Sequence, residues 1–225
     1  MTVTCNIAIR NAATIIVLRN KHKAPSILMG QRGSNAVFMP NKFVFPGGAV
    51  DPSDASIRLV CDISNPCHSR LNAHALEGLQ SALCVAAVRE LWEETGLILG
   101  APGQWVEPVP SDWRGFANMG YLPTADSLKF VFRAITPPGR PRRFDARFFL
   151  VDSEHICSDL DDFSHASDEL QHLQWVSLTR AREFDLPFIT EVVLAEIENR
   201  LSQSNPPPSV PFFMNNEKES IFLRI

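Results

Sequence analysis

The sequence predicts one mixed α/β domain (α+β in its arrangement) that carries a long loop insertion. Three observations support this: short runs of aliphatic and β-branched residues recur at strand length, two segments have helical periodicity, and a polar stretch separates the first strands from the first helix. The chain has 225 residues, of which 45% are hydrophobic and 20% charged, which is enough to bury a core. We therefore expect a single domain over residues 1–225.

The first strands are expected near the start of the chain. Residues 13–18 and 27–30 are rich in Ile, Val and Leu and are separated by polar residues, which predicts two strands joined by a turn. Residues 43–45 form another apolar piece, and Gly47 and Gly48 after it predict a tight turn without side chains. Residues 51–80 have no sustained periodicity, so we expect a mostly irregular segment with one short helix.

A helix is expected from residue 81. One apolar face is formed at the spacing i, i+3, i+4, i+7 by Cys84, Ala87, Val88 and Leu91. Gly96 stands where a glycine commonly ends a helix in a left-handed conformation. The helix should therefore bury one side and stop near residue 95.

The second half of the chain alternates loops and strands before a final helix. The expected elements are a loop at 100–110, strands at 128–134 and 147–151 around the Pro-rich turn 136–141, a last strand at 174–177, and an amphipathic helix at 187–203 that ends at 205–208. The tail 205–225 is given no element.

Charge and composition exclude several classes of function. The net charge is −4 and the pI is about 5.9, which argues against a nucleic-acid-binding protein, since these need a basic face. The five cysteines are odd in number and irregularly spaced, so no disulfide framework is expected. The longest apolar run near the N-terminus is too short to span a bilayer, so we expect a cytoplasmic protein without membrane contact.

Three carboxylates on the predicted helix are the strongest chemical signal. Glu90, Glu93 and Glu94 share an arc of about 100°, turned away from the apolar face, at 100° per residue. Like charges this close repel, and a hard divalent cation such as Mg²⁺ or Mn²⁺ would remove that cost. Arg89 precedes Glu93 by one helical turn and could hold its carboxylate. The spacing alone would favour an ordinary solvated helix face; the glycine turn upstream favours a metal site instead.

The pattern around these residues resembles the Nudix box. Gly48 matches its first glycine, and the run from Arg89 to Leu97 (Arg-Glu-Leu-Trp-Glu-Glu-Thr-Gly-Leu) matches its second half. The resemblance implies a mixed sheet sandwiched between helices and a site for Mg²⁺ or Mn²⁺ at which water attacks a diphosphate. It implies that Glu90, Glu93 and Glu94 are metal ligands and that one of them is the base. It also implies that the Gly48 carbonyl is a further ligand and that Arg89 serves the catalytic carboxylates.

The middle of the box departs from the family pattern. After five intervening residues, Gly48 is followed by Asp54 where the family has Glu, and residues 55–80 then interrupt the box. Counting back from Arg89 instead puts Ser81 at this position, so two candidates remain. An insertion in the box, the segment 27–34 and the segment 142–150 resemble the type-19 branch of the family. That branch implies coenzyme A or an acyl-coenzyme A as substrate; the alternatives are ADP-ribose, another nucleotide, or a non-catalytic nucleotide sensor.

Several other residues have two interpretations. Glu169 is either one more metal ligand or a solvated residue of an acidic loop. Arg32, Arg142 and Arg143 could bind substrate phosphates through paired contacts, but an isolated arginine is more often only an exposed charge or an ion-pair partner. The expected partner is a small nucleotide-derived molecule, and the sequence is also compatible with a homodimer.

Overall fold

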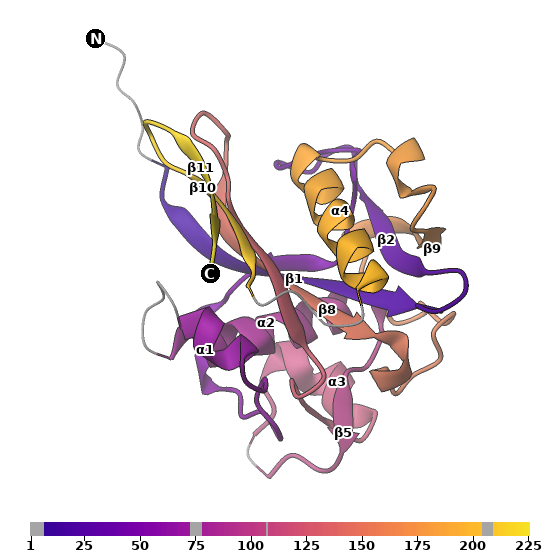
Figure 1. The fold of residues 1–225 in the computed structure, drawn as a ribbon. Helices are drawn as coiled ribbons and strands as arrows, with labels where there is room; N and C mark the ends of the chain where they lie inside the picture. Colours follow the sequence, from indigo (N-terminus) through magenta and orange to yellow (C-terminus); the bar gives the residue numbers. More distant parts are fainter. Residues whose placement is uncertain (1–6, 73–77, 107, 204–208) are drawn as a thin grey trace.

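The structure, a computed structural model, describes residues 7–72, 78–106, 108–203 and 209–225 (Figure 1). A nine-stranded mixed sheet lies at its centre, in the order β11-β10-β7-β8-β1-β2-β3, with β4 joined to β1 and β9 to β2. The strands of this sheet are β1 (Ile9–Arg19), β2 (Ser26–Arg32), β3 (Phe43–Val44), β4 (Gly47–Ala49), β7 (Lys129–Ile135), β8 (Arg143–Asp152), β9 (Leu170–Ser177), β10 (Pro211–Asn215) and β11 (Ser220–Arg224).

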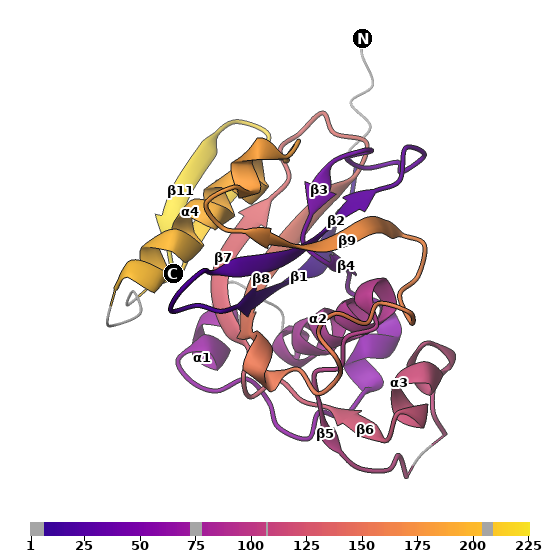
Figure 2. The same ribbon diagram turned by 90° about the vertical axis from the view of Figure 1, so that its right-hand side faces the viewer.

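Helices cover both faces of the sheet (Figures 1 and 2). Side chains alternate between the faces of a strand, and in β1 Ile15 and Val17 point to the core under α2 (Leu79–Thr95), together with Phe149 of β8. Ile16 of β1 points to the opposite core, under α4 (Phe188–Ser202). The predicted arrangement of a mixed sheet between helices is therefore confirmed. No helix in the described ranges has the length and apolarity needed to cross a bilayer.

The predicted regular elements are present and mostly longer than expected. Each expected strand segment overlaps a strand of the sheet, because the runs that were read as strands are the buried centres of longer ones. Helix α2 ends at Gly96, whose φ of 74° is left-handed as the cap prediction requires. Helix α4 closely matches its prediction, and residues 205–208, expected to end it, lie outside the described residues.

Three short elements were predicted wrongly. The expected glycine turn at Gly47–Ala49 is strand β4, paired with β1. The expected loop 100–110 begins with β5 (Gly100–Pro102), which pairs with β6 (Tyr121–Pro123) in a separate small sheet. The unassigned tail contains the hairpin of β10 and β11. Glycine and proline lower the strand propensity of such segments, so only their pairing partners make them strands.

The insertion 55–80 is part of the core and not a surface elaboration. It contains the end of a 3-10 turn at Pro52–Ser56, the short helix α1 (Cys67–Asn72) and the start of α2. Ile57, Ile63 and Leu71 are buried in the same cluster as the apolar face of α2. The expected single short helix is confirmed, but removing the segment would expose apolar surface that these side chains cover.

Candidate metal site on helix α2

The three carboxylates of α2 lie against strand β4. Glu90 and Glu94 are buried, and Glu93 is about one-third exposed. The Gly47 amide donates to Oε2 of Glu94 at 2.7 Å. A Cβ on Gly48 would lie 2.3 Å from Oε1 of Glu90, so only glycine lets the backbone come this close. The structure therefore brings Gly48 and the helix carboxylates together, as the sequence predicted.

Arg89 holds two of the helix carboxylates and a third, that of Asp54, from the turn just before the insertion. Its Nη1 donates to Oε1 of Glu90 at 2.9 Å and to Oε2 of Glu93 at 2.8 Å. Its Nε and Nη2 donate to the two oxygens of Asp54 at 2.9 and 3.1 Å, and Nη2 also reaches the Ala49 carbonyl at 3.0 Å. This fork of bonds fixes the rotamers of the carboxylates around one guanidinium.

Asp54, not Ser81, occupies the open middle position of the motif. Its carboxylate is completely buried and pairs with Arg89, which lies 35 positions later in the chain. Its second oxygen also accepts the Asp51 amide at 2.8 Å, which closes the turn after β4. Asp54 had been left out of the predicted site residues. The only signal for it was its spacing from Gly48, because an insertion of unknown path separated it from Arg89.

Burial disfavours the ionised forms of these carboxylates, and the surrounding protein groups only partly offset this effect. Burial, with a smaller contribution from Glu93, raises the pKa of Glu90 to about 7 against the opposing effect of Arg89. Burial and then the charge of Glu90 raise the pKa of Glu94 well above its usual value. Oε1 of Glu94 is buried without a hydrogen-bond partner. A buried acceptor without a donor, beside two more carboxylates and a side-chain-free strand, fits a divalent cation.

The side chains do not already surround a common point. In the described ranges, no three acidic, histidine or cysteine side chains form a ready cation cage. Nη1 of Arg89 bonds both Glu90 and Glu93, so an ion held here must compete with this guanidinium or use the remaining carboxylate oxygens. Of the candidate ligand oxygens, the partnerless Oε1 of Glu94 is the one that such an ion would satisfy most directly.

Glu169 and Arg32 form an ion pair whose charges act on the helix carboxylates. Nη2 of Arg32 donates to Oε1 of Glu169 at 3.0 Å. The charge of Glu169 helps to raise the pKa values of Glu90 and Glu94, although burial is the main cause in both, and Arg32 lowers the pKa of Glu94. Both residues are therefore within electrostatic range of the candidate metal site, as the metal and substrate interpretations require.

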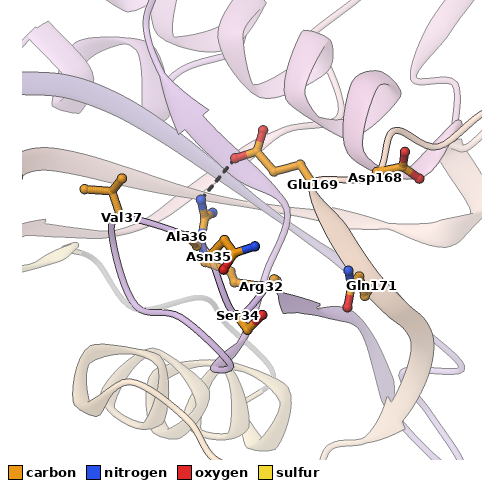
Figure 3. A pocket seen from close by; sticks show the side chains of 9 residues that line it. Arg32, Ser34, Asn35, Ala36, Val37, Asp168, Glu169 and Gln171 are labelled. Atoms are coloured by element: carbon orange, nitrogen blue, oxygen red, sulfur yellow. Dashed lines mark hydrogen bonds and ion pairs between the residues drawn. The ribbon is translucent and has the colours of Figure 1, made fainter.

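A cavity of about 420 Å³ opens beside this pair. Figure 3 shows Arg32 and Glu169 joined across it, with Ser34 and Asn35 of the loop after β2 on one side and Gln171 of β9 on the other. Nε of Arg32 is buried without a hydrogen-bond partner. The cavity is thus lined by one arginine and by the carboxylates of Asp168 and Glu169, and the arginine has donor capacity that the protein does not use.

Arg143 does not line the cavity beside Arg32, and its side chain is bonded to neighbouring parts of the protein. Its guanidinium is buried and donates to the carbonyls of Thr136 and Asn215 and to the carboxylate of Glu217. These bonds fasten the β10–β11 hairpin to β8. Each guanidinium nitrogen thus has one protein acceptor, but two of its five N–H groups are left and Arg143 also lines a second cavity, so its contact with substrate stays a prediction.

A second cavity, of about 220 Å³, is lined by three arginines: Arg10, Arg142 and Arg143. Nη2 of Arg10 lies 3.8 Å from Asp51, and Asp51 lies 4.0 Å from Nη2 of Arg89. This second cavity is therefore linked to the carboxylate cluster through Asp51. Arg10 was missed by the sequence reasoning, because a single arginine at the start of a strand carries no signal of its own.

Asp112 was also missed. It precedes Trp113 in a short 3-10 turn, and its charge contributes to the raised pKa of Glu93 after burial, which is the main cause. Nothing in the sequence placed it near α2, since it comes from the segment between the small-sheet strands β5 and β6.

Comparison with known sequences places the chain beside Nudix hydrolases, although no family model matches it. It is 29% identical to a Caenorhabditis elegans protein assigned as nudix hydrolase 7, over 74% of this chain and 51% of that protein. It is 28% identical to the acyl-coenzyme A diphosphatase NUDT19 of Gallus gallus, over 55% of this chain and 47% of that protein. The chain spans about half the length of the curated relatives it matches.

Comparison with solved structures identifies the fold. A Nudix hydrolase from Alicyclobacillus acidocaldarius superimposes with a TM-score of 0.65 at 28% identity, over 90% of this chain and 100% of the other. The Nudix domain of Shewanella oneidensis NrtR, solved with ADP ribose, has a TM-score of 0.50 at 14% identity, over 86% and 89% of the two chains. The similarity to the NrtR domain concerns the fold alone, whereas the similarity to the Alicyclobacillus acidocaldarius protein also extends to sequence.

Proposed function

By its fold and its sequence similarity the chain belongs to the Nudix hydrolase family, and from that premise we propose that it is a metal-dependent diphosphate hydrolase acting on a small nucleotide derivative. The observation that carries the proposal is the set of helix carboxylates packed against Gly48 and braced by the Arg89–Asp54 pair. This arrangement keeps buried negative charge in a fixed geometry, which costs stability unless a ligand uses it.

The ion would be held by Glu90, Glu93 and Glu94, with the Gly48 carbonyl and Glu169 as further ligands. When bound, Mg²⁺ or Mn²⁺ offsets charge on a diphosphate and lowers the pKa of a bound water. Arg89 holds two of the carboxylates in position, and one of the carboxylates takes the proton of the attacking water. Arg32, which pairs with Glu169 through Nη2 and lines the first cavity, would meet a phosphate oxygen there.

Within this class we propose coenzyme A or an acyl-coenzyme A as the substrate. The similarity to the acyl-coenzyme A diphosphatase of Gallus gallus supports this choice. Coenzyme A carries a phosphate on its ribose that ADP-ribose lacks, and that group needs its own cationic partner. The second cavity supplies one in Arg10 and Arg142, close to the carboxylates through Asp51. Arg142 and Arg143 keep their proposed substrate role at this cavity, and Arg10 joins them.

The experiment that tests the function is a substrate panel with product identification by mass spectrometry. Coenzyme A, acetyl-coenzyme A, dephospho-coenzyme A and ADP-ribose are incubated with the protein in Mg²⁺ or Mn²⁺, with and without a chelator. We expect the highest kcat/KM for a coenzyme A, cleavage to a phosphopantetheine and an adenosine bisphosphate, and no turnover with chelator. A preference for ADP-ribose would refute the coenzyme A assignment alone. Binding without turnover in saturating metal would favour the nucleotide sensor.

Arg142→Ala should reduce the preference for coenzyme A over dephospho-coenzyme A by about 1–3 kcal/mol in kcat/KM, the cost of one lost charge-assisted contact. Arg140→Ala is the matched control, because Arg140 is exposed in the adjoining turn and does not line the cavity. Equal kcat/KM ratios in wild type and Arg142→Ala would exclude Arg142 from the ribose-phosphate site.

A further inference from the structure

Strand β11 is the edge of the sheet and has a row of outward backbone groups. Val210 and Ile225 exchange both hydrogen bonds, at 2.7 and 2.9 Å, so they form a hydrogen-bonded pair of the antiparallel β10–β11 ladder. Such pairs alternate along a ladder, which makes Leu223 and Ile221 the next residues bonded to β10. The N–H and C=O groups of Ser220, Phe222 and Arg224 therefore point away from β10. In the described part of the chain no strand lies beyond them.

An exposed aromatic surface adjoins this edge. Phe222 is 54% exposed and Phe188, at the start of α4, is 69% exposed. Both pack on Phe213, with ring centroids 6.2 and 6.5 Å away. Figure 2 shows β11 at the outer edge of the sheet. An apolar edge strand with free backbone groups is a ready template for another strand, and proteins seldom leave one uncovered.

We propose that β11 pairs antiparallel with β11 of a second copy of this chain across a two-fold axis, with Phe222 opposite Phe222. This register aligns the outward groups of one copy with those of the other, because Ser220 then faces Arg224 and both are outward-facing residues. Every facing pair along the register is compatible: the two Phe222 rings form an aromatic pair, Ile221 faces Leu223, and Arg224 faces a neutral serine. No like charges stand directly opposite each other.

The self-complementary register is the reason for choosing a second copy over a foreign strand. A two-fold interface must match one surface patch with itself, and the five residues of β11 do so about Phe222. The proposed interface is separate from the carboxylates of α2, since strands β10, β7 and β8 lie between β11 and β1. It does not depend on the proposed hydrolase activity.

Sedimentation velocity on the full chain measures whether it forms the proposed dimer. Protein concentrations up to about 100 µM are used, so that a dimer with a micromolar dissociation constant is populated. Wild type should be dimeric. Phe222→Lys and Phe222→Glu should each weaken the dimer at least about tenfold, because each places like charges opposite one another across the axis. An equimolar mixture of the two variants should recover a heterodimer. Met119→Lys, the same change at an exposed residue of the separate segment after α3 (Arg114–Asn118), should remain dimeric.

Thermal unfolding checks that the variants are folded. Phe222→Pro is a second way to block the pairing of β11 with another copy. Proline there removes an outward N–H and leaves the β10 ladder intact, as at other sheet edges, so it should also give a folded monomer. A monomeric wild type at all concentrations would overturn the proposal. So would dimers that survive both charged variants, or a mixture of Lys and Glu variants that stays monomeric.

Discussion

Glu93→Gln should lower kcat on the cleaved diphosphate by on the order of 10²–10⁴ while leaving the fold intact. The amide has nearly the shape of the carboxylate but lacks its charge, so it would weaken both the proposed metal ligation and the bond from Arg89. Glu93 is the most exposed of the three carboxylates, which makes it the one whose neutralisation disturbs packing least. The effect should therefore appear in turnover and in metal affinity, and not in the melting temperature.

The matched control is Glu191→Gln, an exposed glutamate in the first turn of α4 on the other side of the sheet. Its kcat should equal that of wild type. Metal affinity is measured in parallel by titration with Mn²⁺, so that a lost ligand can be separated from a lost base. Near-normal turnover of Glu93→Gln with the best substrate would remove Glu93 from the site.

Arg89→Met should lower the free energy of unfolding by about 3–5 kcal/mol, the usual cost of removing one partner from a buried ion pair. Methionine keeps much of the volume of the side chain, so the loss is electrostatic. It leaves the fully buried Asp54 carboxylate without its guanidinium and removes the cation between Glu90 and Glu93. Urea unfolding at constant ionic strength measures the change.

Arg180→Met is the control for this variant, because Arg180 forms an exposed pair with Glu183 and its loss should leave the free energy of unfolding unchanged. A double-mutant cycle with Asp54→Asn isolates the pair, and the two changes together should cost less than their sum. Additive effects, or an Arg89→Met variant as stable as wild type, would show that the Asp54 contact contributes nothing.

The insertion and the tail show how far local patterns reach. Residues 55–80 look irregular in sequence because their apolar residues have no period, yet Ile57, Ile63 and Leu71 meet the core at separate points along an irregular path. Strands β10 and β11 escaped prediction for a related reason: they lie in a tail interrupted by prolines and make a hairpin only against β7. In both segments, burial is specified by distant partners and not by neighbours in the chain.

At Arg143 the local pattern predicted exposure, and the side chain is buried. As one of two adjacent arginines after a turn, it had the pattern of an exposed phosphate ligand. Its strand position turns it inward, where Asn215 and Glu217 bind it, whereas the adjacent Arg142 points to solvent. Which of two neighbouring residues faces a ligand depends on strand register, and the register of β8 is set by its parallel pairing with β1.

The sequence by itself determined helix α2, its end at Gly96 and the shared arc of Glu90, Glu93 and Glu94, because helical periodicity and capping are local properties of a few turns. The resemblance to a family motif also predicted that Gly48 and this helix belong to the same site. Tertiary contacts were needed to show that Asp54 completes the Arg89 network, that Arg32 pairs with Glu169, and that Arg143 is bonded to Glu217. Those contacts join residues that are far apart in the chain, so they depend on the paths of β4, β9 and the insertion through space, which no local spacing encodes.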